Sequence, residues 1–137
     1  MATLAQIRAD LASVLETIPG WNVNNGYIGD QVLQYSFKIA RPAFDPRMVF
    51  SEAKKSVTFT VTAYAPRIPA EEAEAAIDAL CEPSGSGSLI AAVQTGSNWS
   101  QTIDYAQVVS CGETQVIVWA QDSVEYLGAQ FQIEVVW

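Results

Sequence analysis

The chain contains 137 residues, half of them apolar, and it carries a formal net charge of −8 with no histidine. A chain of this length and composition is expected to fold as one domain with a substantial core, which excludes intrinsic disorder. The absence of histidine excludes Ser-His and Cys-His catalytic pairs, and the acidic balance argues against tight nucleic-acid binding, because such binding depends on lysine and arginine contacts to phosphate.

The first predicted element is an amphipathic helix that begins after Thr3, a residue type that caps helices well. Pro19 and Gly20 mark its end. Apolar residues recur along this helix at helical spacing, namely Leu4, Ile7, Leu11, Val14, Leu15 and Ile18. The Asn- and Gly-rich connection 21–27 has room for a short strand.

Two alternating runs then predict strands, each with one buried face. The first run places Leu33, Tyr35, Phe37 and Ile39 on one face. The second run points Val57, Phe59, Val61 and Ala63 inward and Thr58, Thr60, Thr62 and Tyr64 outward. Between the two strands we predict an extended loop or hairpin arm near residues 42–56. Its apolar side chains, Phe44, Met48 and Phe50, are expected to dock on another molecule.

Residues 69–80 predict a second helix, with a proline in the first turn and acidic side chains near its positive N-terminal end. Its packing face consists of Ala73, Ala76, Ile77 and Leu80. Its acidic residues are Glu71, Glu72, Glu74 and Asp78. We interpret these carboxylates as a solvated face rather than as an acid–base pair. The Ser-Gly stretch 83–88 predicts a turn in which Ser86 or Ser88 caps a short helix, 89–94, and an anion site there is the weaker alternative.

Three strands complete the predicted sheet, at 101–109, 114–121 and 124–137, with turns at 110–113 and 122–123. The run 116–119 is apolar on both faces. This pattern predicts a central strand, covered on one side by helices and on the other by a neighbouring subunit or the folded-back arm. The last strand places Leu127, Ala129, Phe131, Ile133, Val135 and Trp137 on one face. Either the domain's own core or a neighbouring subunit must cover the Trp137 indole.

This order of elements predicts the α+β class, with a mainly antiparallel sheet of about five strands and helices packed on one face. A single domain is expected to span residues 1–137. Cys81 and Cys111 are expected to be buried or idle thiols, because a disulfide is uncommon in a cytoplasmic chain. No catalytic residue, metal ligand or cofactor is predicted.

Charge is distributed unevenly, since six of the seven basic residues lie between positions 38 and 67. They are Lys38, Arg41, Arg47, Lys54, Lys55 and Arg67. The rest of the chain is acidic, so one subunit carries two unlike patches that suit head-to-tail contact between copies. A cationic loop without such a partner is an equal alternative. The predicted subunit or partner interface comprises Lys38, Arg41, Phe44, Arg47, Met48, Phe50, Lys54, Lys55, Trp119 and Trp137.

Several segments resemble one protein family. They are 4–21, the strand 56–63 with the acidic helix after it, the Ser-Gly turn and helix 85–93, Trp99, Tyr105, and 124–136 with its Tyr-Leu-Gly-Ala step. Together they resemble the tail-terminator proteins of long-tailed bacteriophages, of a type common among phages of actinobacteria. The resemblance spans nearly the whole chain in the order of its elements.

The resemblance implies a ring, six subunits in this family, that stops polymerisation of the tail tube and joins the tail to the head connector. The implied partners are other copies of the chain, the tail tube protein and the head–tail connector protein. DNA would pass through the lumen without specific binding. The implied location is the tail–neck region of the virion, after assembly in the host cytoplasm, and no catalytic residues or cofactor come with the family. Apolar runs far shorter than ~20 residues predict no membrane span.

Other functions remain open from the residues. A head-completion adaptor or a tail tube subunit shares the size and the α+β character of a terminator. A small-molecule or peptide-binding module is an alternative of another class, in which the apolar strand around Trp119 lines a pocket. An enzyme is the weakest alternative, because the chain lacks histidine and carries no catalytic motif.

Overall fold

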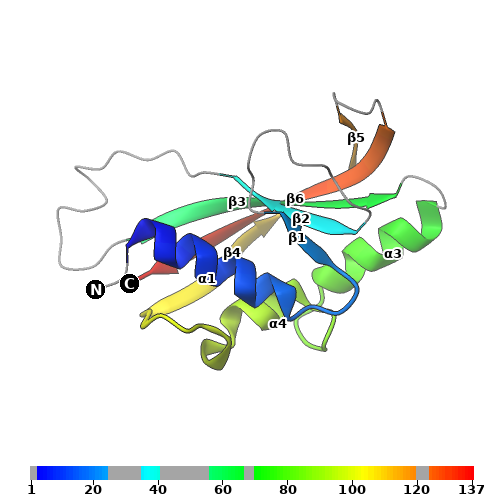
Figure 1. Cartoon of the computed structure of the whole chain (residues 1–137). Coiled ribbons are helices and arrows are strands. Elements are labelled where there is room, and N and C mark those ends of the chain that lie inside the picture. Colours follow the sequence, from blue (N-terminus) through cyan, green and yellow to red (C-terminus); the bar gives the residue numbers. More distant parts are fainter. Residues whose placement is uncertain (1–2, 25–34, 41–55, 67–69, 120–123) are drawn as a thin grey trace.

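The computed structural model describes residues 3–24, 35–40, 56–66, 70–119 and 124–137. Within them, a six-stranded mixed sheet is covered on one face by helices, which confirms the predicted α+β class (Figure 1). The elements are α1 (Leu4–Glu16), β1 (Asn22–Asn24), β2 (Ser36–Ile39), β3 (Ser56–Pro66), α3 (Ala70–Leu80), α4 (Leu89–Gln94), the 3-10 helix η1 (Gly96–Asn98), β4 (Tyr105–Cys111), β5 (Gln115–Trp119) and β6 (Val124–Val136). The predicted arm near 42–56 lies outside the described residues, except for the Ser56 end.

The helices form where local signals place them. Thr3 caps α1, since its hydroxyl accepts a hydrogen bond from the Gln6 N–H at 3.2 Å while the Gln6 side chain accepts one from the Thr3 N–H at 2.8 Å. Ser88 caps α4 through a 3.0 Å hydrogen bond from the Ala91 N–H. The buried sides of α1 and α3 match the predicted apolar faces. The three helix predictions are therefore confirmed.

The centre of the sheet is a long antiparallel pair between β3 and β6. Its register runs without interruption from Ser56 opposite Val136 to Pro66 opposite Tyr126. On the other side of β3 the order continues through β2 to β1. The connection 21–27 does hold a strand, and β1 pairs with β2 in parallel, which makes the sheet mixed.

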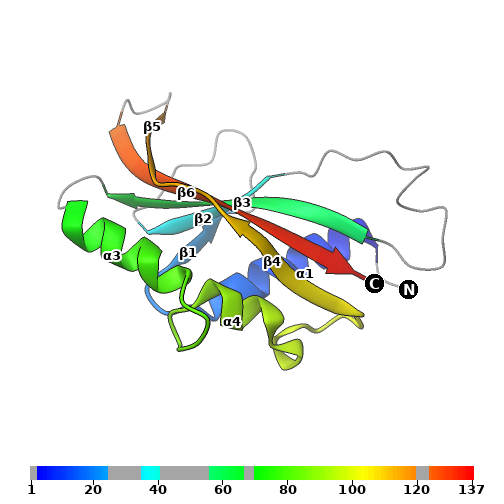
Figure 2. The ribbon, with the colours of Figure 1, turned by 180° about the vertical axis from the view of Figure 1, so that it is seen from behind.

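β4 and β5 both pair with β6, one after the other, along the same edge. β4 lies against 131–136 and β5 against 124–128, so the chain keeps its direction between them (Figure 2). The predicted turn at 110–113 is therefore wrong. The Gly112 N–H donates a 2.6 Å hydrogen bond to the Gln130 carbonyl and continues the pairing. A Cβ at position 112 would lie 2.9 Å from that carbonyl oxygen, so only glycine fits there without a shift.

The same arrangement corrects the prediction of a central strand at 116–119. Among the described strands, β5 pairs only with β6, and the Val116 side chain is 52% exposed. With the first half of β6, β5 forms a hairpin that projects from one end of the sheet (Figures 1 and 2). The apolar run 116–119 therefore lies in a strand with one described neighbour. β6 pairs with β5 on one side and with β3 on the other, so β5 is at the edge of the described sheet.

The core lies between the sheet and the helices, and it contains the predicted inward faces of β3 and β6. Two residues of β3 predicted to point to solvent are nevertheless buried, namely Thr62 at 8% and Tyr64 at 6% exposure. The Tyr64 ring meets the Tyr126 ring edge to face, with centroids 6.2 Å apart. The alternating pattern predicted correctly on which face of the sheet Tyr64 lies. It did not predict the contact with Tyr126, because that residue belongs to β6, a strand distant in sequence.

Candidate assembly surface

The predicted interface residues are only partly within the described structure. Arg41, Phe44, Arg47, Met48, Phe50, Lys54 and Lys55 lie outside the described residues. Lys38 is half-buried on β2, opposite Thr62 of β3. Trp119 ends β5, opposite Val124. Trp137 is only 9% exposed and belongs to the core cluster, so the domain itself covers most of its indole.

The sheet face opposite the helices carries a polar surface that we call the polar sheet face. Its residues come from three neighbouring strands, namely Thr58 and Thr60 of β3, Gln130, Gln132 and Glu134 of β6, and Tyr105, Gln107 and Ser110 of β4. They share this face because strand residues alternate and the register aligns them in rows. In one row, Thr58 and Gln107 flank Glu134.

Hydrogen bonds between strands order the polar sheet face. Both the Tyr105 hydroxyl and the Gln107 amide donate to one oxygen of Glu134, at 3.0 and 3.3 Å. The Thr60 hydroxyl donates to the Gln132 side-chain oxygen at 3.1 Å. The bond to Glu134 is the main reason that the pKa of Tyr105 is raised above its ordinary value. Glu134 is charged, and so is Lys38 of β2, which shares this side of the sheet because it lies opposite Thr62, the partner of Gln130. The described part of this face is therefore mostly uncharged and polar, with one charge of each sign.

A negatively charged surface lies on α3, and we call it the acidic helix face. Glu71, Glu72, Glu74 and Asp78 are all exposed. The last turn of α3 contains no basic residue. The sequence predicted a solvated acidic face on this helix, and the four exposed side chains confirm it.

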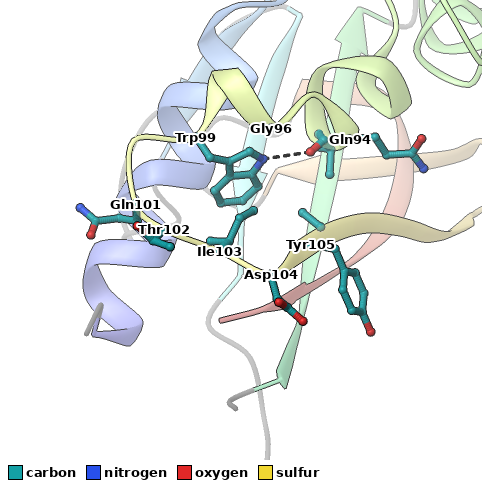
Figure 3. Close-up of a pocket in the computed structure, with 10 residues that line it drawn as sticks. Gln94, Gly96, Trp99, Gln101, Thr102, Ile103, Asp104 and Tyr105 are labelled. Atoms are coloured by element: carbon teal, nitrogen blue, oxygen red, sulfur yellow. Dashed lines mark hydrogen bonds between the residues drawn. The ribbon is translucent and has the colours of Figure 1, made fainter. Parts of the chain in front are cut away.

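A hollow of about 330 Å³ lies at the start of β4 (Figure 3). Trp99 forms part of its wall, and its indole N–H donates a 2.9 Å hydrogen bond to the Val93 carbonyl of α4. Among the described residues that line it, Asp104 and Tyr105 are the titratable ones. The hollow lies near the C-terminal end of β6, whereas the backbone of Trp119 lies opposite Val124, at the other end of that strand.

The described residues contain no group of three or more Cys, Asp or Glu side chains placed to hold a metal ion. None of the described helices is both long and apolar enough to cross a membrane. No protein-family model matches the chain, and no curated protein sequence matches it.

Sequence reasoning did not single out Tyr105, Gln107 or Glu134 as a cluster. Alternation along 124–137 places Glu134 on the polar side of the last strand, which was predicted. Its partners on β4 depend on a register that no local pattern specifies. The cluster therefore became visible only with the pairing of β4 and β6.

Proposed function

We propose that this protein is a structural component of a long-tailed bacteriophage, a tail terminator that assembles as a ring, ends tube polymerisation and joins the tail to the head connector. Its partners in this proposal are other copies of the chain, the tail tube protein and the connector protein. It carries out no bond-making or bond-breaking step and holds no cofactor.

The observation that best supports the proposal is the polar sheet face. A ring through which DNA passes needs a lumen that does not hold phosphate, because each lysine or arginine contact adds salt-dependent grip. The polar sheet face offers amides, hydroxyls and the carboxylate of Glu134 across three neighbouring strands, and Lys38 on the next strand, β2, is half-buried. We propose that this face lines the lumen.

Charge supports contact between copies. A closed ring joins two different surfaces of each subunit, so unlike patches on one chain favour it. The acidic helix face provides one patch. The segment 38–67 provides the other, since it holds six of the seven basic residues. We propose that this basic segment meets the acidic helix face of the next subunit.

The oligomeric state tests the proposal. Purified protein should sediment as a closed oligomer, and negative-stain images should show separate rings that also cap isolated tail tubes. Open-ended tubes grown from the protein alone would instead indicate a tube subunit. Rings that bind heads and not tails would indicate a head-completion adaptor. A monomer at high concentration that does not bind tails would contradict an assembly role and favour a binding module.

Charge exchange tests the proposed contact. The double change Lys54→Glu with Lys55→Glu should reduce ring yield about tenfold or more, as should Glu71→Lys with Glu74→Lys. Combining the four substitutions should restore rings if the two patches meet. Glu113→Lys, at an exposed position between β4 and β5, is the matched control. Substitutions at exposed positions usually alter stability by less than about 0.5 kcal/mol, so we expect the changes at Glu71, Glu74 and Glu113 to leave the melting temperature unchanged.

The charge exchange also separates two failures. Rings that form equally well with every variant would exclude the charge contact while leaving the ring intact. Loss of rings in both doubles without rescue in the quadruple variant would mean that each patch binds something other than its proposed counterpart.

A further inference from the structure

Among the described residues, the large hydrophobic side chains that are exposed gather on one edge of the sheet. They are Tyr105 at 46%, Val109 at 57% and Val116 at 52% exposure, and all three belong to β4 or β5. Among the described strands, β4 pairs only with β6. We propose that the first part of β4, residues 105–108, forms a docking site together with the hollow beside it. The ligand is an extended segment of a partner protein that carries a lysine or an arginine, and the proposal is independent of the ring.

Residues 105–108, which we call the β4 edge, are open to an added strand. An edge strand presents backbone N–H and C=O groups that another chain can pair with, and lysine or proline commonly protects such an edge. The β4 edge contains neither residue type. A bulge sets its limit, because the register with β6 shifts between Val108 and Ser110. We therefore expect the added strand to pair with 105–108 and to end beside the exposed Val109 side chain.

The hollow of about 330 Å³ adjoins the β4 edge, since Tyr105 and Ala106 belong to both (Figure 3). Its volume is near the lower end of the ~300–1,000 Å³ typical of ligand pockets. Ala106 lies opposite the buried Val135 and so faces the helices. The residue of an added strand that lies opposite Ala106 points to the same side. Its side chain can therefore enter the hollow, in the way that pockets beside a sheet edge select particular peptides.

Hydrogen bonds hold the lining of the hollow in place. Trp99 is 7% exposed, and its indole N–H is bonded to the Val93 carbonyl at 2.9 Å. The Asp104 N–H donates a 2.7 Å hydrogen bond to the Val136 carbonyl, which anchors this part of the lining to β6. A site that is ordered before its ligand arrives loses less entropy on binding.

The charge of the lining favours a basic side chain in the hollow. Asp104 belongs to the lining and is exposed. The hydroxyl of Tyr105, another lining residue, donates to the Glu134 carboxylate at 3.0 Å, which adds a second negative charge nearby. No lysine or arginine occurs in 68–137, so the lining contains no positive side chain. A guanidinium or ammonium group therefore has an oppositely charged partner in Asp104, whereas a carboxylate would be repelled.

Fluorescence anisotropy of a labelled peptide, measured with the full-length protein, tests the proposal. The probe is a short peptide of alternating threonine and valine with one central arginine. Two matched probes replace its arginine with glutamate or methylate its backbone nitrogens, which removes the hydrogen-bond donors of the added strand. We expect the arginine peptide to bind, and each matched probe to bind about tenfold more weakly or worse.

Two protein variants separate the hollow from the general negative charge of the chain. Asp104→Asn should weaken binding of the arginine peptide about tenfold, because it removes the charge of the lining. Glu113→Gln is the matched control, since Glu113 is exposed and lies outside the lining, and it should leave the affinity unchanged. Both substitutions are at exposed positions, so an unchanged melting temperature is expected.

Hydrogen exchange with and without the arginine peptide locates the docked segment. Amide exchange at 105–108 should slow, whereas exchange in β1, at the opposite end of the described strand order, should not change. Three results would overturn the proposal. They are equal affinity for all three probes, slowed exchange on the acidic helix face in place of the β4 edge, and no binding at millimolar peptide.

Discussion

The carboxylate of Asp10 accepts two hydrogen bonds from Ser100, one from its backbone N–H at 3.1 Å and one from its hydroxyl at 2.6 Å. The other carboxylate oxygen accepts the Gln101 N–H at 3.0 Å. Asp10 is only 5% exposed, so an α1 side chain fixes the segment that leads into β4. β4 begins at Tyr105 and not at 101, as its sequence predicted: Tyr105 already lies opposite Val136, the last residue of β6, and the backbone of 100–101 bonds to the Asp10 side chain instead.

Replacing Asp10 with alanine should destabilise the domain by about 3 kcal/mol, because three part-buried donors lose a charged acceptor. Urea unfolding followed by tryptophan fluorescence measures the change. Asp10→Asn keeps the shape and one acceptor, and we expect it to cost less than Asp10→Ala. Equal costs for the two variants would mean that packing, and not hydrogen bonding, determines the role of this residue.

Gly112→Ala should lower the free energy of unfolding by about 1–3 kcal/mol, because the added methyl would meet the Gln130 carbonyl at 2.9 Å. Chemical denaturation is the measurement. Gly87→Ala is the matched control, since a Cβ at position 87 meets nothing within 4 Å. A loss of similar size in both variants would show that chain entropy, and not the close approach to Gln130, is responsible.

Removing Val135, Val136 and Trp137 should destabilise the domain by several kcal/mol, as burial of one large apolar side chain contributes about 1.5–3 kcal/mol. All three are at least 90% buried, and the Val136 carbonyl also accepts the Asp104 N–H at 2.7 Å. Thermal unfolding of the truncated chain provides the measurement. A melting temperature within error of the parent value would exclude a structural role for these residues.

The rate of alkylation of Cys81 should keep increasing with pH above the pH at which an ordinary cysteine thiol is fully ionised. Burial, followed by the influence of Cys111 and then of Asp78 and Glu82, raises the pKa of the Cys81 thiol from 9.0 to about 11. The reactive thiolate is therefore scarce at neutral pH, and the rate should rise about tenfold per pH unit until the pH approaches this pKa. Peptide mass spectrometry after timed iodoacetamide pulses measures it. A rate that levels off near pH 9 would show an unperturbed thiol.

Much of the fold could be predicted from local signals. Thr3 and Ser88 cap the helices that follow them, and strict alternation identifies β3 and β6 with their buried faces. These signals suffice because each acts within a few residues of the chain.

Long-range pairing explains what sequence reasoning missed. The direct continuation of β4 into β5 depends on a bond between Gly112 and Gln130, and the burial of Tyr64 depends on Tyr126. No pattern within a short window carries such information, because register is a property of two strands together.

β6 lies between β3 and the edge formed by β4 and β5, and this position affects how the chain folds while it is being synthesised. A ribosome releases α1, β3 and α3 well before the strand that must lie against β3 along its whole length. Until then β3 has one unsatisfied edge, which is a template for pairing with other chains. Folding therefore depends on late, distant contacts, and synthesis at high yield should benefit from slow translation, low temperature or chaperones that shield this strand.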